Sequence, residues 1–152
     1  MPANRALTGI FIKFLPATTR KHLMWNVISI CIGASLGALG RWQLGRCFNQ
    51  PQFLLPWGTL AANLVGAYLI GVLVALFQNL PHIDPVWRLA LITGFLGALT
   101  TFSSFSVETV ALLQSGRYSL ALLQCSLHLL GSLLLTTLGL ATGQWLWAGK
   151  AL

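Results

Sequence analysis

The sequence predicts an all-α membrane protein in which one domain crosses the bilayer with four helices. Only 7% of its 152 residues are charged and 56% are hydrophobic, whereas soluble domains carry about 25% charged residues. Four apolar stretches come close to or exceed the roughly 20 residues that a transmembrane helix needs; they are residues 24–44, 57–77, 89–113 and 120–147. The six tryptophans lie at or near the ends of these stretches, as expected at membrane–water interfaces: Trp25, Trp42, Trp57, Trp87, Trp145 and Trp147.

The linkers between these stretches carry helix breakers: Pro51 and Pro56 after the first, Pro81 and Pro85 after the second, and Gly116 after the third. Residues 1–23 differ from the rest, because their short apolar run is interrupted by Lys13 and Pro16 and shows no clean signal-peptide cleavage site. We therefore predict a flexible or interfacial extension over residues 1–23 and a four-helix membrane domain over residues 24–150.

The basic residues of the domain give it almost no preferred orientation. Four spans put Arg88 and Lys150 on one side and Arg41, Arg46 and Arg117 on the other, which is close to no bias under the positive-inside rule. A chain that inserts in both directions is a candidate for an antiparallel, dual-topology homodimer. The basic extension, when counted, favours a cytoplasmic N-terminus, and it indicates contact with anionic membrane lipid and no nucleic-acid partner.

Small residues recur every four positions in the first two helices: Gly33 and Gly37, then Gly58, Ala62 and Gly66. Such faces let membrane helices approach closely. They serve either packing within one subunit or a dimer interface. Because four helices enclose little space, we expect an ion pathway to need the second subunit.

The third helix contains the polar segment LTTFSSFSVE (residues 99–108) near the middle of the membrane. Threonine and serine side chains compete for backbone hydrogen bonds, and two glycines (Gly94 and Gly97) precede them. We predict a break in helix three, where freed carbonyls can hold a cation and freed amides can face an anion. The alternative is an unbroken helix whose hydroxyls bond back to its own carbonyls.

Several side chains near this segment suit a dehydrating anion. Phe102 and Phe105 share a helix face, and the edges of aromatic rings are electropositive, although plain packing is the commoner use of phenylalanine. Asn63 lies deep in the second stretch, where an amide is costly unless it is used. Its NH₂ group is a fixed hydrogen-bond donor.

The fourth helix carries a polar stripe with one residue every four positions: Gln124, His128, Ser132 and Thr136. The stripe is either an ion pathway or a set of interhelical hydrogen bonds. Glu108 is the one acid within a span, and burying it costs roughly 2.5–3.5 kcal/mol on insertion scales. We expect Glu108 to be partnered or functional.

Three motifs resemble the Fluc/CrcB family of small fluoride channels: GASLGALGRW (33–42), GTLAANLVGAYLIG (58–71) and GFLGALTTFSSFSVE (94–108). The resemblance covers residues 24–147. It implies an antiparallel homodimer with two pores in a bacterial inner membrane, exporting fluoride passively and so lowering its toxicity in the cytoplasm. It also implies a structural sodium ion on the two-fold axis.

The resemblance further assigns roles to individual residues. The family's pore residues map to Asn63, Phe102, Phe105 and Arg41, and to the stripe with His128, Ser132 and Thr136. The sodium ligands are backbone carbonyls, which map to Gly97 and Thr100. Because the family's track carries hydroxyl-type residues, Gln124 and His128 depart from its pattern. Residues 1–23 have no counterpart in the resemblance.

Two other functions are consistent with a small four-helix protein. A proton-coupled small multidrug-type exporter needs an ionisable acid in its substrate site, and Glu108, towards the far end of helix three, is the one candidate. A non-transporting assembly subunit explains the glycines but not the aligned donors. We do not expect an enzyme, because no acid–base pair or nucleophilic set appears and the three cysteines have neither disulfide nor metal spacing.

Overall fold

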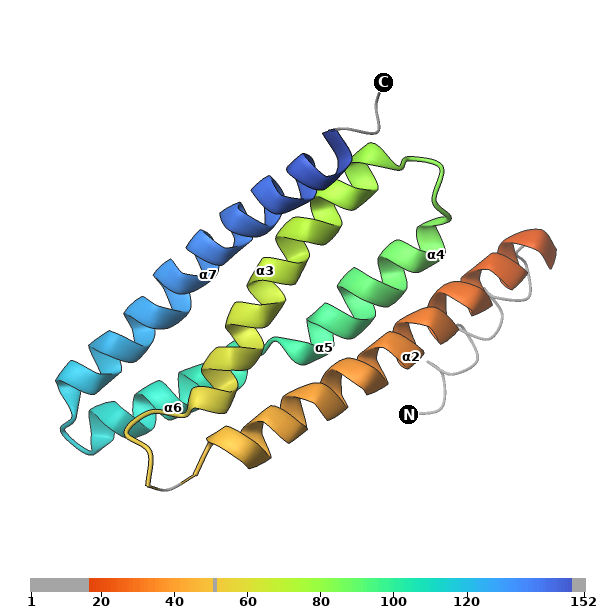
Figure 1. Cartoon of the computed structure of the whole chain (residues 1–152). Coiled ribbons are helices and arrows are strands. Elements are labelled where there is room, and N and C mark those ends of the chain that lie inside the picture. The colour runs from red at the N-terminus through yellow and green to blue at the C-terminus, as the bar shows by residue number, and fades with distance from the viewer. Residues whose placement is uncertain (1–16, 51, 149–152) are drawn as a thin grey trace, which may run out of the picture.

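The computed structural model describes residues 17–50 and 52–148, which form a bundle of helices (Figure 1). Within this part of the chain, four helical segments are long and apolar enough to cross a membrane: Lys21–Phe48, Trp57–Asn79, Pro85–Gln114 and Tyr118–Trp147. The four predicted spans are thereby confirmed, and the chain is a multi-pass membrane protein.

The first two spans are helix α2 (Ala17–Phe48) and helix α3 (Trp57–Asn79). Because α2 begins at Ala17, residues 17–23 of the predicted extension continue the helix, while residues 1–16 lie outside the described residues. The start of α3 is capped from outside the helix. The side-chain oxygen of Asn49 accepts hydrogen bonds from the backbone amides of Gly58 (2.7 Å) and Thr59 (3.3 Å), which satisfies amides that have no partner within α3.

The third span consists of four helical pieces. Helix α4 (Pro85–Arg88) is capped by the preceding residue, Asp84, whose carboxylate accepts from the amide of Val86 at 2.9 Å. A π-helical segment, η1 (Leu89–Leu96), and the short helix α5 (Gly97–Leu99) follow. Thr100 (φ −77°, ψ 153°) and Thr101 (φ −152°, ψ 113°) then have extended backbones, and helix α6 runs over Phe102–Gln114. The extended pair lies within the segment where the sequence predicts a break.

Helix α6 ends in a glycine turn that leads directly into helix α7 (Tyr118–Ala148). Gly116 has a φ of +73°, which a residue with a side chain rarely adopts. The amides of Gly116 and Arg117 donate to the carbonyls of Leu113 (3.0 Å) and Leu112 (2.9 Å). These two bonds form a Schellman motif, which satisfies the last carbonyls of α6 and returns the chain as an antiparallel neighbour.

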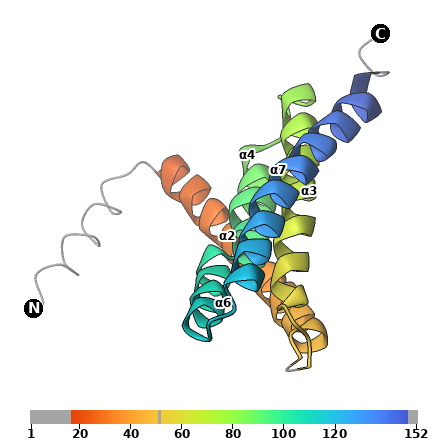
Figure 2. The same ribbon diagram turned by 90° about the vertical axis from the view of Figure 1, so that its left-hand side faces the viewer.

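Two helix pairs form the bundle. Helix α3 packs along α7, and α2 packs against η1 and α5; Figures 1 and 2 show both pairs from perpendicular directions. Glycines let the backbones approach, because a side chain at Gly71 would overlap the Thr136 carbonyl and one at Gly139 would overlap the Tyr68 carbonyl. The α3–α7 pair is therefore held at close backbone contact.

The small-residue face of α2 is used within the chain. A side chain at Gly33 would overlap the carbonyl oxygen of Ala90, and one at Gly37 would overlap that of Phe95, both in η1. On α3, a side chain at Gly66 would overlap the methyl group of Thr100. These glycines therefore take part in packing within one subunit.

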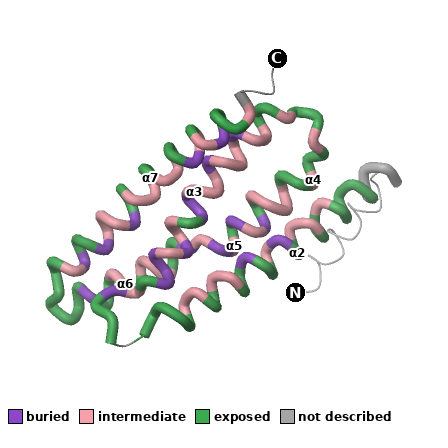
Figure 3. Tube along the Cα trace, in the orientation of Figure 1, coloured by how far each residue is buried: buried purple, intermediate pink, exposed green. Residues whose placement is uncertain are grey.

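Most residues on the outer faces of the bundle are exposed, and the buried ones gather along α3 and around α5 (Figure 3). One buried cluster joins Ala62 of α3 to Leu96 and Leu99, just before the extended residues. Described tryptophans at the helix ends, such as Trp25, Trp87 and Trp145, are more than half exposed, as suits side chains at the lipid interface. This cluster therefore includes Leu99, the residue immediately before the extended pair Thr100 and Thr101.

Candidate functional site

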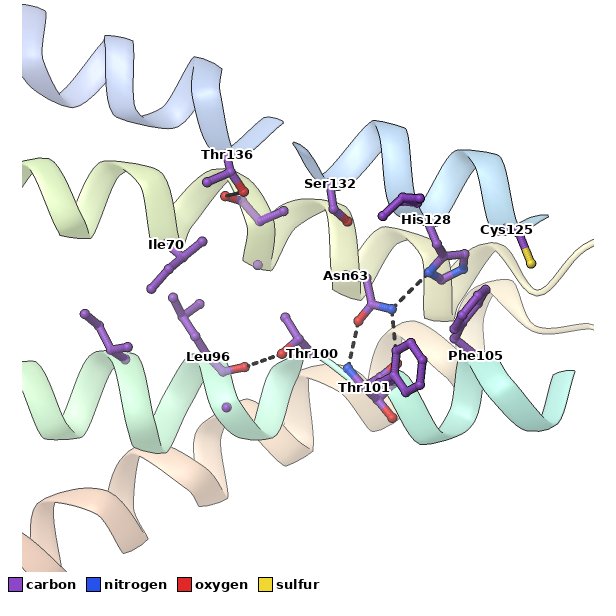
Figure 4. Close-up of a pocket in the computed structure, with 16 residues that line it drawn as sticks. Asn63, Ile70, Leu96, Thr100, Thr101, Phe105, Cys125, His128, Ser132 and Thr136 are labelled. Atoms are coloured by element: carbon purple, nitrogen blue, oxygen red, sulfur yellow. Dashed lines mark hydrogen bonds between the residues drawn. The ribbon is translucent and has the colours of Figure 1, made fainter. Parts of the chain in front are cut away.

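A cavity of about 670 Å³ lies between α3, α7 and the interrupted third span (Figure 4). We call it the central cavity. It brings together all the predicted site residues except Arg41: Asn63, Gly97, Thr100, Phe102, Phe105, His128, Ser132 and Thr136. Residues from three separate spans thus face one space, which is the placement that a shared ion site requires.

Asn63 bonds the chain where helix three is interrupted. Its Oδ1 accepts from the amide of Thr101 at 2.7 Å, and its Nδ2 donates to the Thr101 carbonyl at 3.1 Å. The same Nδ2 contacts Nδ1 of His128 at 3.0 Å. Both amide hydrogens of Asn63 therefore have acceptors within the chain, and an anion must replace one of these acceptors to bind there.

The interruption separates two backbone carbonyls from the amides that would bond them in a continuous helix. The amide of Thr101, four residues after Gly97, donates to Asn63. The amide of Ser104, four residues after Thr100, donates to the Thr101 hydroxyl at 3.2 Å. The carbonyls of Gly97 and Thr100 thus lose their helical donors, and carbonyl oxygens are suitable ligands for a hard cation.

Two aromatic rings and the His128 imidazole form a row along the cavity. The ring centroids of Phe102 and Phe105 are 5.5 Å apart with the planes tilted by 57°, and those of Phe105 and His128 are 4.5 Å apart. Phe102 is 79% exposed in the single chain. A ring that is so exposed is not a core residue of the subunit.

The stripe on α7 bonds to other helices at three of its four positions. Gln124 Nε2 donates to Glu108 of α6 at 3.3 Å, His128 contacts Asn63, and the Thr136 hydroxyl donates to the carbonyl of Ala67 in α3 at 3.0 Å. Three members of the stripe therefore make interhelical hydrogen bonds, and His128, Ser132 and Thr136 line the central cavity.

Arg41 lies elsewhere, in a second cavity of about 510 Å³. Its walls include Thr59, Ser104 and Glu108, and Thr101 lines both this cavity and the central one. The resemblance assigns both Arg41 and the two phenylalanines to the pore; within the single chain they line different cavities, and Thr101 lines both.

Glu108 is partnered, as expected from its position in an apolar span. Its Oε1 accepts from the Thr59 hydroxyl at 2.6 Å and its Oε2 from Gln124 Nε2 at 3.3 Å. Asn49 extends this network, because its Nδ2 donates to Thr59 Oγ1 at 3.0 Å. The carboxylate thus connects the starts of α3 and α7 to α6.

Three residues in these networks were not singled out from the sequence: Asn49, Thr59 and Thr101. Thr101 carried a usable signal, because a threonine three residues before Ser104 fits a helix N-cap, and its hydroxyl does accept from that amide. Asn49 and Thr59 carried no such signal in the sequence, because an asparagine in a loop and a threonine near a helix start can each have several structural roles.

Comparisons with known proteins identify the family of the chain. Residues 28–140 match the family model described as CrcB-like protein, Camphor Resistance (CrcB). A protein of Albidiferax ferrireducens named fluoride-specific ion channel FluC is 64% identical over 82% of this chain and 95% of its own length. Proteins with the same name from Variovorax paradoxus and Pseudomonas aeruginosa are 59% and 52% identical, over 80% and 81% of this chain and 97% and 98% of their own lengths. The chain belongs to the CrcB-like family.

Proposed function

We propose that this chain forms a fluoride-selective channel that lets fluoride leave the cytoplasm down its gradient and so lowers fluoride toxicity. The observation that carries the proposal is the near-full-length match to relatives named fluoride-specific ion channels. The residues that line the central cavity support it. A channel moves an ion without converting it chemically, so the proposed activity is not enzymatic.

Fluoride is small and strongly hydrated, so a pore must replace its water with closely spaced donors. Asn63 supplies amide hydrogens, Ser132 a hydroxyl, and Phe102 and Phe105 ring edges. Among the residues that line the central cavity, none is a Lys, Arg, Asp or Glu. An ion bound by neutral donors can leave as well as enter, which conduction requires.

We propose that Asn63 admits the ion by exchanging acceptors. Its Nδ2 contacts His128 Nδ1 at 3.0 Å, and both residues line the central cavity. Fluoride is an acceptor as well, so it can take the hydrogen that His128 now accepts, while the bonds to Thr101 keep the amide in place.

The working unit is proposed to be an antiparallel homodimer, built from the domain of residues 24–150 and lying in the bacterial inner membrane. Three observations support it: the near-balanced loop charges, the 79% exposure of Phe102, and a central cavity that is open at the surface of the single chain. A second copy would cover the exposed ring and enclose the path.

A structural sodium ion is the proposed cofactor, with the carbonyls of Gly97 and Thr100 as its ligands. The donor set fits, because the amides of Thr101 and Ser104 are bonded elsewhere and carbonyl oxygens suit hard cations. When bound, a central cation would offset the negative charge of permeating ions and join the two subunits at the interrupted helices.

Fluoride efflux from liposomes tests the function. Purified protein in vesicles loaded with potassium fluoride should release fluoride to a fluoride electrode after valinomycin is added, with no proton gradient, while protein-free vesicles retain it. Vesicles loaded with chloride should release little. Efflux that requires a proton gradient would support the exporter instead, and equal passage of chloride would contradict fluoride selectivity.

A further inference from the structure

Two hydrogen-bonded networks end on α7, one at His128 and the other at Gln124, which are one helical turn apart. Each network leaves one side-chain atom without a partner. Among the described residues, the buried side-chain oxygen or nitrogen atoms without a hydrogen bond are Gln124 Oε1 and His128 Nε2. Both residues are deeply buried, with exposed fractions of 2% and 6%. Buried polar atoms nearly always have partners, so these two atoms need an explanation.

The first network determines which nitrogen of His128 carries the hydrogen. Thr101 bonds Asn63 through an amide that can only donate and a carbonyl that can only accept, so the orientation of the Asn63 side chain is fixed. Nδ2 therefore faces His128, and because Nδ2 only donates, His128 Nδ1 must be the acceptor. The neutral imidazole then has its hydrogen on Nε2, and the atom without a partner is a donor.

The second network determines which end of Gln124 faces Glu108. The amides of Gly58 and Thr59 donate to Asn49 Oδ1, so Asn49 Nδ2 must donate to the Thr59 hydroxyl. That hydroxyl then donates to Glu108 Oε1. A carboxylate only accepts, so Gln124 presents its Nε2 to Oε2. The atom that remains, Oε1, is an acceptor.

The two unpartnered atoms are complementary and share a helix face. Gln124 and His128 are four residues apart on α7, which places their side chains on adjacent turns of one face. Figure 4 shows one ring nitrogen of His128 directed at Asn63 and the other directed at the turn that bears Cys125. Gln124 belongs to that same turn.

We propose that Gln124 is a positioning residue for the Asn63–His128 pair. Its Oε1 accepts a hydrogen bond from one water molecule, which in turn accepts from Nε2–H of His128, because the two atoms do not bond each other directly. The bond joins the Glu108 network to the central cavity and favours the tautomer whose Nδ1 accepts from Asn63. This inference rests on the proposed function, because Asn63 is the residue that the ion is proposed to meet.

Fluoride itself does not suit the space between these two atoms. An ion there would accept from His128 Nε2–H but would face the oxygen of Gln124, which repels it. A water molecule can accept from one atom and donate to the other. Gln124 thus acts through His128 and Asn63, and it does not contact the permeating ion.

Nitrogen NMR of His128 tests the inference without measuring transport. The sequence has three histidines, and the other two, His22 and His82, are exposed, so His22→Gln with His82→Gln leaves a single labelled ring. At neutral pH we expect Nε2 to be protonated and Nδ1 to be unprotonated. A ring protonated on Nδ1, alone or with Nε2, would overturn the inference.

The variant Gln124→Met removes the acceptor at nearly constant volume. We expect its Nε2–H to exchange with water faster and to shift upfield, whereas Gln144→Met, the same change at an exposed site on α7, leaves the signal unchanged. In the unmodified protein we expect a cross-peak between Nε2–H and a bound water molecule. An Nε2–H that Gln124→Met does not affect would overturn the inference.

Transport provides the second readout. Losing one hydrogen bond corresponds to about a fivefold change, so we expect Gln124→Met to lower fluoride efflux per folded protein about fivefold and Gln144→Met to leave it unchanged. Unchanged efflux in Gln124→Met would overturn the positioning role. Unmodified protein that carries no fluoride would contradict the proposed function instead, and the spectra would still decide whether the bond exists.

Discussion

The side chain of Asn63 bonds both backbone groups of Thr101, with Oδ1 at 2.7 Å from the amide nitrogen and Nδ2 at 3.1 Å from the carbonyl oxygen. An extended residue in an apolar span has no helical partners for these groups, and an unsatisfied backbone group is costly in lipid. One amide side chain satisfies both at once. Asn63 is therefore as much a structural partner of the interrupted span as a candidate ion ligand.

Asn63→Asp should disrupt this arrangement. The carboxylate can still accept from the Thr101 amide, but its second oxygen would face the Thr101 carbonyl and the His128 acceptor without a hydrogen to donate. We expect a loss of at least about 2 kcal/mol in the free energy of unfolding, measured by thermal or denaturant unfolding in detergent. The control is Gln78→Glu, the same amide-to-carboxylate change at an exposed site on α3. Equal stability of the two variants would contradict the dependence on Asn63.

Phe102→Ile and Phe105→Ile, made separately, should lower fluoride efflux while the protein remains folded. Isoleucine keeps apolar bulk but lacks the electropositive ring edge. We expect roughly a tenfold decrease in efflux per folded dimer, equivalent to about 1.4 kcal/mol, with dimer content checked by size-exclusion chromatography. Phe77→Ile, whose position lies outside the central cavity, serves as the control. Wild-type efflux from well-folded variants at both positions would make these rings packing residues.

Glu108→Gln should affect assembly more than transport. Glutamine can accept from the Thr59 hydroxyl, but its NH₂ then faces the NH₂ of Gln124, so a buried donor is left unpaired at about 1–3 kcal/mol. We expect less folded protein and a lower unfolding temperature, and the pH dependence of efflux should stay the same. If the variant instead abolishes a steep pH dependence, Glu108 carries protons and the exporter becomes the better explanation.

Gly37→Ala should destabilise the protein far more than Gly40→Ala. A methyl group at Gly37 would overlap the Phe95 carbonyl of η1, whereas one at Gly40 would meet the Leu99 side chain at 3.5 Å, an ordinary contact. Alanine favours a helix by about 1 kcal/mol over glycine, so Gly40→Ala should be neutral or stabilising. Thermal unfolding gives the unfolding temperature of each variant. Similar temperatures would show that the packing of α2 against η1 does not require close backbone contact.

Dual topology can be measured by labelling single cysteines in cells. In a background where Cys31, Cys47 and Cys125 are alanine, Ser115→Cys marks the α6–α7 loop and His82→Cys the α3–α4 loop. An antiparallel dimer requires each loop to be labelled by impermeant reagent in about half of the molecules, because the two orientations are equally populated. Complete labelling of one loop and protection of the other would show a single orientation.

The sequence predicted the spans well, because membrane crossing depends on composition over a window of residues. Their ends followed from the tryptophans and breakers, apart from the start of α2 at Ala17, where polar residues continue a helix without any hydropathy signal. The polar run in helix three indicated the segment in which Thr100 and Thr101 are extended.

Contacts between distant residues could not be predicted in this way. Asn63 and Thr101 are 38 positions apart, and only tertiary packing brings them together. The π-helical segment η1 packs against Gly33 and Gly37, so local propensity alone does not determine its backbone conformation. The position of Arg41 in the second cavity likewise depends on how α2 lies against the rest of the bundle.

The extended pair Thr100–Thr101 also brings together the oppositely charged ends of two successive helix dipoles. The helical column that ends at Leu99 presents the negative end of its peptide dipoles, and α6, which begins at Phe102, presents a positive end. Each end is equivalent to about half an elementary charge. Two extended residues thus place a weakly negative pole beside a weakly positive one in the middle of the membrane, so the chain can attract ions of both signs there without burying a formal charge.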